Sequence, residues 1–142
     1  MKKTLLSLLA ATLLLTSSAT ILSASTTAKT TKPFLIQGKL PHLTMMVKIL
    51  WNDEDLALTK EQKKELLIIR KHTMSSAKKL NLQIVSLENQ VIKGSKEGVK
   101  PERLRNFVYE IAQLRAEATI VHLECIYNTR RLLSEDQLYI LE

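Results

Sequence analysis

The stretch Gly94-Ser95-Lys96-Glu97-Gly98-Val99-Lys100-Pro101 decides the fold of this chain, because it contains every glycine and proline between residues 42 and 142. Glycine and proline are the residues that interrupt helices most strongly. The sequence therefore predicts one strong turn, at residues 94–101. Pro101 suits the first turn of a following helix, where an N–H group would have no partner within the helix.

Two long helices are predicted on either side of this turn, over residues 60–92 and 101–132. In each segment, apolar residues recur at spacings of three and four, which places them on one helix face. The two series are Leu80, Ile84, Leu87 and Val91, and then Phe107, Ile111, Leu114, Ala118, Val121 and Cys125. No strand pattern competes, so the predicted fold class is all-α, with the two helices packed as a long antiparallel hairpin.

A short motif recurs where two helices should begin: Leu58-Thr59-Lys60-Glu61-Gln62 and Leu133-Ser134-Glu135-Asp136-Gln137. Both copies have the form of a capping box. In this box the hydroxyl accepts a hydrogen bond from the backbone N–H three residues later, and the glutamine side chain accepts one from the N–H of the cap residue. Leu133 and Leu138 are also placed to pack as a hydrophobic staple, whereas Leu58 has no apolar counterpart and must pack elsewhere.

The N-terminal segment has the pattern of a cleavable signal peptide. Met1-Lys2-Lys3 is basic, and the apolar run that follows ends near Leu15, short of the roughly 20 residues that a membrane-spanning helix needs. We therefore expect residues 1–24 to be removed and the mature protein to be periplasmic, without a membrane anchor. Residues 25–40 are rich in Ser, Thr and Lys and are predicted to form a flexible leader before a helical domain at residues 41–142.

Composition narrows the classes of function. The chain has a net charge of +7, which in an exported protein favours acidic polypeptides or membrane surfaces over nucleic acid as partners. Cys125 is the only cysteine, so no internal disulfide can form, and dimerisation would supplement the stability that comes from helix packing. The sequence contains no Gly-rich phosphate loop, nucleophile elbow or Cys-x-x-Cys motif, and we expect a protein that is not an enzyme.

These features together resemble the Spy/CpxP family of periplasmic proteins over nearly all of residues 41–142. The resemblance rests on the signal peptide, a short helix after Pro41-His42-Leu43, the two Leu-[Thr/Ser]-x-x-Gln motifs and the long hairpin. It implies a hairpin with short N- and C-terminal helices that forms a curved, intertwined homodimer. It also implies ATP-independent chaperoning of unfolded envelope proteins, without a cofactor, or binding to a membrane stress-sensor protein.

The short helix predicted after Pro41-His42-Leu43 is apolar on nearly every side, so part of it must face a partner. That partner is either the second subunit of the dimer or an unfolded client. For the second case we predict a client-binding surface, in which basic residues surround apolar ones and attract acidic chains. The candidates are Met45, Met46, Ile49 and Trp51, with Lys48, Arg70 and Lys71 at the rim.

The alternative function is the binding or sensing of a transition metal. The zinc-resistance-associated proteins and the CnrX-type sensors, which are related to the Spy/CpxP family, use the same helical scaffold for this purpose. The candidate ligands are His42, Met46, Glu65, His122 and Cys125, whose imidazole, sulfur and carboxylate donors suit zinc, copper, nickel or cobalt. Of these, His42, His122 and Glu65 resemble the donor set of the CnrX-type sensors. The competing interpretation is that Cys125 packs as a small apolar residue on the seam, with His122 at its border.

Overall fold

Four helices follow one another in the computed structural model, which describes residues 32–36, 38 and 40–141. Their bounds are α1 (Leu43–Ile49), α2 (Lys60–Lys96), α3 (Pro101–Leu132) and α4 (Glu135–Leu141). The described residues contain no strand, which confirms the predicted all-α class. No described helix is both long enough and apolar enough to cross a membrane. The predicted signal peptide, residues 1–24, lies outside the described residues.

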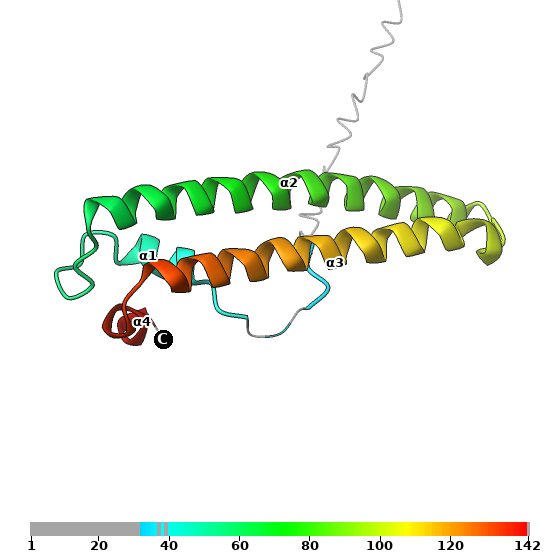
Figure 1. Ribbon diagram of the computed structural model, residues 1–142. Coiled ribbons are helices and arrows are strands. Elements are labelled where there is room, and N and C mark those ends of the chain that lie inside the picture. Colours follow the sequence, from blue (N-terminus) through cyan, green and yellow to red (C-terminus); the bar gives the residue numbers. More distant parts are fainter. Residues whose placement is uncertain (1–31, 37, 39, 142) are drawn as a thin grey trace, which may run out of the picture. The chain divides into compact units, whose positions relative to one another are not determined.

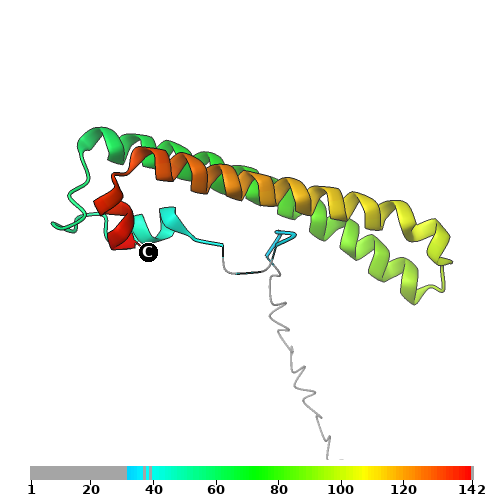
Figure 2. The same cartoon turned by 60° about the horizontal axis from the view of Figure 1, so that its bottom comes forward.

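The long helices α2 and α3 lie side by side and run antiparallel (Figures 1 and 2). The apolar series predicted for the seam faces inward, since Ile84 of α2 and Ala118, Val121 and Cys125 of α3 are buried. The other predicted seam residues are partly buried. The predicted hairpin is therefore confirmed. The short helices α1 and α4 pack near its open end, where α1 contacts both α3 and α4.

Gly94 lies inside a helix and not in the turn, which corrects the predicted end of the first long helix. α2 continues to Lys96, whereas the prediction ended near residue 92. Gly94 is buried, and a Cβ atom placed there would lie only 2.8 Å from Cδ2 of Leu104 in α3. The missing side chain thus permits the close approach of the two helices, and this packing outweighs the low helix propensity of glycine.

Gly98 is the residue that ends α2. Its φ angle is +72°, in the left-handed region that glycine adopts without steric cost. Its N–H donates to the carbonyl of Ser95 at 3.2 Å, and the N–H of Val99 donates to the carbonyl of Gly94 at 2.9 Å. This pair of hydrogen bonds forms the Schellman motif that closes many helices. The predicted turn is present, but only the second of its two glycines makes it.

Replacing Gly98 with alanine should destabilise the protein by about 1 kcal/mol, because a Cβ atom is disfavoured at this positive φ. Urea denaturation followed by circular dichroism measures the change. Lys100→Ala is the matched control, since Lys100 lies in the same turn at a φ of −59° and its side chain caps no backbone group. That control should cost less than about 0.5 kcal/mol. Equal losses in the two variants would contradict this role of Gly98.

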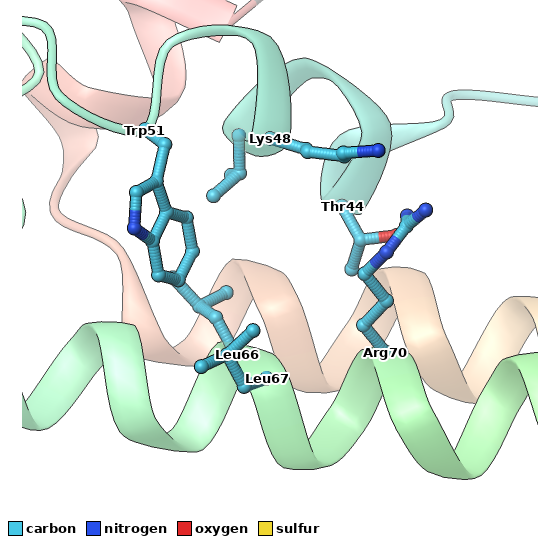
Figure 3. Close-up of a pocket in the computed structure, with 7 residues that line it drawn as sticks. Thr44, Lys48, Trp51, Leu66, Leu67 and Arg70 are labelled. Carbon is cyan, nitrogen blue, oxygen red and sulfur yellow. The ribbon is translucent and has the colours of Figure 1, made fainter.

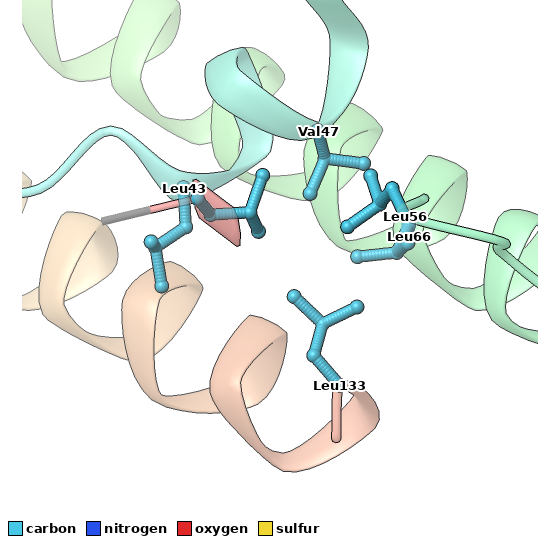
Figure 4. Close-up of a cluster of buried hydrophobic side chains, with 6 residues drawn as sticks. Leu43, Val47, Leu56, Leu66 and Leu133 are labelled. Atoms are coloured by element: carbon cyan, nitrogen blue, oxygen red, sulfur yellow. The ribbon is translucent and has the colours of Figure 1, made fainter. Parts of the chain in front are cut away.

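A cluster of buried leucine and valine side chains lies at the open end of the hairpin (Figure 4). It draws on α1, the loop after it, α2, the junction between α3 and α4, and α4 itself. Its members are Leu43, Val47, Leu56, Leu66, Leu133 and Leu141. A helix of seven residues, such as α1, is not stable by itself in water. The burial of Leu43 and Val47 in this cluster therefore holds α1 in place.

Part of the predicted leader contacts α3. The N–H of Leu35 donates to Oγ1 of Thr119 at 2.7 Å and to the carbonyl of Arg115 at 3.2 Å. The Arg115 guanidinium donates to the carbonyl of Lys32 at 3.0 Å, and it also pairs with Glu88 of α2 at 2.7 Å. The leader is thus bonded to α3, and Arg115 links it to α2 through Glu88, a feature that the composition of the leader did not indicate.

Candidate functional site

Both predicted capping boxes are present. Oγ1 of Thr59 accepts a hydrogen bond from the N–H of Gln62 at 3.1 Å, and the N–H of Thr59 donates to Oε1 of Gln62 at 3.0 Å. In the second copy, Oγ of Ser134 accepts from the N–H of Gln137 at 3.2 Å, and the N–H of Ser134 donates to Oε1 of Gln137 at 3.0 Å. Serine therefore serves in the second box as threonine does in the first.

The two glutamines also bond to each other across the open end of the hairpin. Nε2 of Gln62 donates to Oε1 of Gln137 at 2.8 Å, and Nε2 of Gln137 donates to Oε1 of Gln62 at 3.3 Å. The same amide groups donate to backbone carbonyls, Gln62 to Leu132 at 2.7 Å and Gln137 to Leu56 at 2.8 Å. We call this arrangement of Gln62 and Gln137 the glutamine clasp. It joins the start of α2 to the end of α3 and to the start of α4.

A pocket of about 340 Å³ lies between α1 and the first half of α2 (Figure 3). Its floor is formed by Val47 and Leu66, which are 1% and 2% exposed. Trp51 and Leu67 form its apolar walls. The Trp51 ring is itself held in place, because it packs on the buried cluster and the Nζ of Lys63 lies 5.7 Å from the ring centroid.

The pocket has one apolar end and one cationic end. Figure 3 shows Trp51 beside Leu66 and Leu67 on one side, while the side chains of Lys48 and Arg70 extend toward the other. No acidic side chain lines the pocket. Within the described residues, neither Lys48 nor Arg70 has an ion-pair partner, since the pairs present are Lys93 with Glu97 and Arg115 with Glu88. The cationic end is thus free to bind an anion.

The structure brings together three of the seven predicted client-binding residues, because Lys48, Trp51 and Arg70 all line this pocket. Met45, Met46 and Ile49 lie instead on the outer face of α1, where they are 49%, 38% and 65% exposed. Lys71 lines a separate, wider apolar hollow on α2 together with Phe34 and Met74. The seven predicted residues are therefore divided among this pocket, the outer face of α1 and the separate hollow.

α2 also exposes an apolar stripe that begins at the pocket. Leu67, Met74, Val85 and Ile92 share one helix face, because intervals of seven and eleven residues are close to whole numbers of helical turns. Each of the four side chains is at least 42% exposed. Apolar surface of this kind marks interaction sites on many proteins. The residues of this stripe were not predicted as a binding surface. Leu66 and Leu67 were not predicted to line a pocket either. They belong to the apolar run Leu66-Leu67-Ile68-Ile69, which does not by itself show which of its side chains are buried.

Two of the five predicted metal ligands, His42 and His122, meet in the structure. Their rings stack with centroids 4.9 Å apart and planes at 21°, and Phe34 from the leader stacks on His122 at the same distance. Burial lowers the pKa of His122 below its usual value, and the charges of His42 and Lys32 lower it further. Its Nδ1 atom is buried without a hydrogen-bond partner in the described part of the chain. The stack therefore favours a neutral His122.

The other three predicted ligands have different surroundings. The Sγ atom of Cys125 is 3.8 Å from Oγ1 of Thr44, Met46 lies on the exposed side of α1, and Glu65 lines a shallow hollow with Asn128. Among residues 32–36, 38 and 40–141, no group of three His, Cys, Asp or Glu side chains is placed to hold a metal ion. Cys125 is buried on the seam, as the competing interpretation of the sequence expected.

Lowering the pH should destabilise the protein through His122. Because its folded-state pKa is below the usual value of about 6.5, the unfolded chain binds more protons between these two pKa values. Stability is therefore at its full value above about pH 6.5 and decreases as the pH falls toward the lowered pKa. Urea denaturation at a series of pH values measures this loss. His122→Phe, which keeps an aromatic ring against Phe34, should show a smaller loss, and an identical loss would contradict the assignment.

Comparison of the chain with models of known protein families, with curated proteins and with solved structures found no match.

Proposed function

We propose that this protein is a periplasmic, ATP-independent chaperone or envelope-stress binding protein that holds unfolded polypeptides. The observation that carries the proposal is the apolar surface exposed beside basic residues on α1 and α2. A chaperone that accepts many partners needs adaptable apolar contacts of this kind more than one fitted pocket. The two Leu-[Thr/Ser]-x-x-Gln motifs, through which the sequence resembles the Spy/CpxP family, support the same proposal.

The short helix α1 is central to this function. Leu43 and Val47 hold its inner face in the buried cluster. Its outer face therefore exposes Met45 and Ile49 in a fixed position. Methionine side chains are flexible and adapt to apolar partners of different shape. The neighbouring Lys48 adds a positive charge that increases the rate of encounter with acidic chains. In this proposal, unfolded envelope proteins bind loosely here and are kept from aggregating.

The proposal includes a homodimer. Toward the turn, α2 and α3 expose Val85, Ile92 and Val108, each at least 42% accessible. A second copy of the chain would bury such side chains, and the exclusion of apolar surface from water would stabilise the pair. Analytical ultracentrifugation should give about twice the mass of one chain. A monomer at concentrations where the protein is active would contradict this part of the proposal.

Suppression of aggregation is the direct test. Several unrelated denatured proteins are diluted into buffer with the purified mature protein, with and without a chelator, and light scattering is followed. Protection that does not depend on the chelator supports the proposed chaperone function. Two results would instead support the alternative metal-binding function. One is protection that disappears when the chelator is added, and the other is a protein that gives no protection but contains stoichiometric bound metal. If the protein neither suppresses aggregation nor binds metal, the chaperone proposal is overturned. The remaining function would then be binding to one dedicated partner, such as a membrane stress-sensor protein.

A matched pair of variants localises the activity. Met45→Gln removes an apolar side chain that is 49% exposed on α1, and Ile120→Gln removes one that is 48% exposed on α3. Since both positions are open to solvent, neither change should unfold the protein. Met45→Gln should weaken protection, whereas Ile120→Gln should leave it unchanged. Equal effects of the two changes would show that α1 is not the client-binding element.

A further inference from the structure

The pocket between α1 and α2 combines an apolar end with a cationic end. One end is formed by Trp51, Leu66 and Leu67, whose side chains are apolar apart from the indole N–H of Trp51. The other end has two cationic side chains, Lys48 and Arg70, with no carboxylate among the lining residues. A molecule that satisfies both ends must itself have an apolar part and an anionic part.

The size of the pocket limits the ligand to a single narrow chain. Its volume of about 340 Å³ lies at the lower end of the range of roughly 300–1,000 Å³ that is typical of small-molecule sites. The floor residues Val47 and Leu66 belong to the buried cluster, so the pocket cannot deepen without disturbing the core. Leu67 is 56% exposed and stands at the edge, where it can cover part of a bound chain.

The electrostatic surroundings favour an anionic headgroup. Arginine binds carboxylates and phosphates through two parallel hydrogen bonds, and lysine adds a second positive charge. Arg70 is half-buried, so its charge is screened by water less than that of a fully exposed side chain. In the described residues neither cation is neutralised by a protein carboxylate. The same end would repel a cationic headgroup.

We propose that this pocket binds a single-chain anionic amphiphile, such as a medium-chain fatty acid or an alkyl phosphate. The headgroup lies between Lys48 and Arg70, and the alkyl chain lies against Trp51 and Leu67. Carboxylate and phosphate headgroups share the required chemistry, and the test below distinguishes them. This inference goes beyond the proposed function, because it assigns a small-molecule ligand and requires no unfolded client.

Trp51 makes the proposal directly measurable. It is the only tryptophan of the chain and it lines the pocket, so its fluorescence responds to a ligand that binds there. The full mature protein is titrated with sodium decanoate and with decyl phosphate, each below the concentration at which it forms micelles. Decyltrimethylammonium and decyl maltoside are the cationic and uncharged controls. We expect saturable changes with the two anions, little change with the controls, and binding that tightens about fourfold for each further CH₂ that the pocket buries. The ratio of the decanoate and decyl phosphate affinities identifies the preferred headgroup.

Charge variants test the headgroup position. Arg70→Gln and Lys48→Gln should each weaken binding about tenfold, the usual effect of losing one charge-assisted hydrogen bond. Lys78→Gln is the matched control, because Lys78 is an exposed lysine of α2 that lines a different hollow, and it should leave the affinity unchanged. Circular dichroism confirms that each variant is folded, and Lys48 is exposed enough that its change should not affect folding.

Three results would overturn the proposal. They are the absence of a saturable signal with both anions, equal binding of decyltrimethylammonium, and equal weakening by Lys78→Gln and Arg70→Gln. The titration contains no client, so its failure is separate from a failure of the aggregation assay. If the protein suppresses aggregation but gives no titration signal, the proposed function stands and the proposal of this ligand is overturned.

Discussion

Replacing Leu56 with alanine should destabilise the protein by about 3 kcal/mol, the usual cost of removing a fully buried leucine side chain. Leu56 is 0% exposed and belongs to the buried cluster at the open end of the hairpin. The loss combines the transfer of apolar atoms with the cavity that remains, because the surrounding side chains relax only in part. Urea denaturation followed by circular dichroism measures the change in the free energy of unfolding.

In the Leu56→Ala variant, α1 should lose its packing before the long helices unfold. That helix has only seven residues, and it depends on the cluster that Leu56 completes. Near-ultraviolet circular dichroism of Trp51, which packs against the same cluster, should change at lower urea concentrations than the helical signal of α2 and α3. Leu82→Ala is the control, because Leu82 is 63% exposed and its loss should cost less than about 0.5 kcal/mol. Similar costs for the two leucines would show that the cluster does not hold the open end together.

Breaking the glutamine clasp should have the second large effect. Gln62→Ala and Gln137→Ala should each destabilise the protein by about 2 to 3 kcal/mol. Each change removes one half of a capping box, worth about 1 kcal/mol, and leaves buried or partly buried amide and carbonyl groups without partners. The carbonyls affected are those of Leu132 for the first change and Leu56 for the second.

A double-mutant cycle separates the clasp from the two capping boxes. If the boxes acted independently, the costs of Gln62→Ala and Gln137→Ala would add in the double variant. Because each amide bonds to the other, at 2.8 Å and 3.3 Å, we expect a coupling on the order of 1 kcal/mol. Gln90→Ala is the control, since its side chain is exposed and makes a single long contact of 3.5 Å with Ser86. Strict additivity would mean that the clasp contributes nothing beyond its two boxes.

The clasp and the pocket lie at the same end of the hairpin, so stability and function are linked there. The clasp holds the carbonyl of Leu56, and the side chain of that residue packs with Val47 and Leu66, which form the pocket floor. A variant that loosens the clasp should therefore also weaken the response of Trp51 to an amphiphile. The charge variants of the pocket should weaken binding without lowering stability, which separates the two effects.

Much of the fold could be predicted from local sequence patterns. The spacing of apolar residues at three and four positions predicted both long helices and their seam, and Ser134 and Thr59 identified two helix starts. These predictions succeeded because helical periodicity and capping depend on groups only a few residues apart. The exception was Gly94. The low helix propensity of glycine predicted that the first long helix ends before this residue, whereas α2 continues past it. Its place inside α2 depends on Leu104 of the facing helix, which lies 2.8 Å from where a Cβ would stand.

The candidate site could be predicted only in part. Lys48, Trp51 and Arg70 were predicted as one surface, whereas the structure shows that Lys71 lines a different hollow and that Met46 lies on the outer face of α1. A helix of seven residues is too short for its apolar pattern to show which side packs inward. The orientation of α1 is set by its partners in the cluster.

The sequence by itself therefore determined the helices, the turn and the two capping boxes, since each depends on interactions within a few residues. Only the tertiary structure decided that the two boxes meet, that the leader is anchored on α3, and that α1 forms a pocket with α2. The bonds that make these features join residues far apart in the chain, 75 positions between Gln62 and Gln137 and 84 between Leu35 and Thr119. Such contacts follow from the packing of whole helices against one another, which no local pattern encodes.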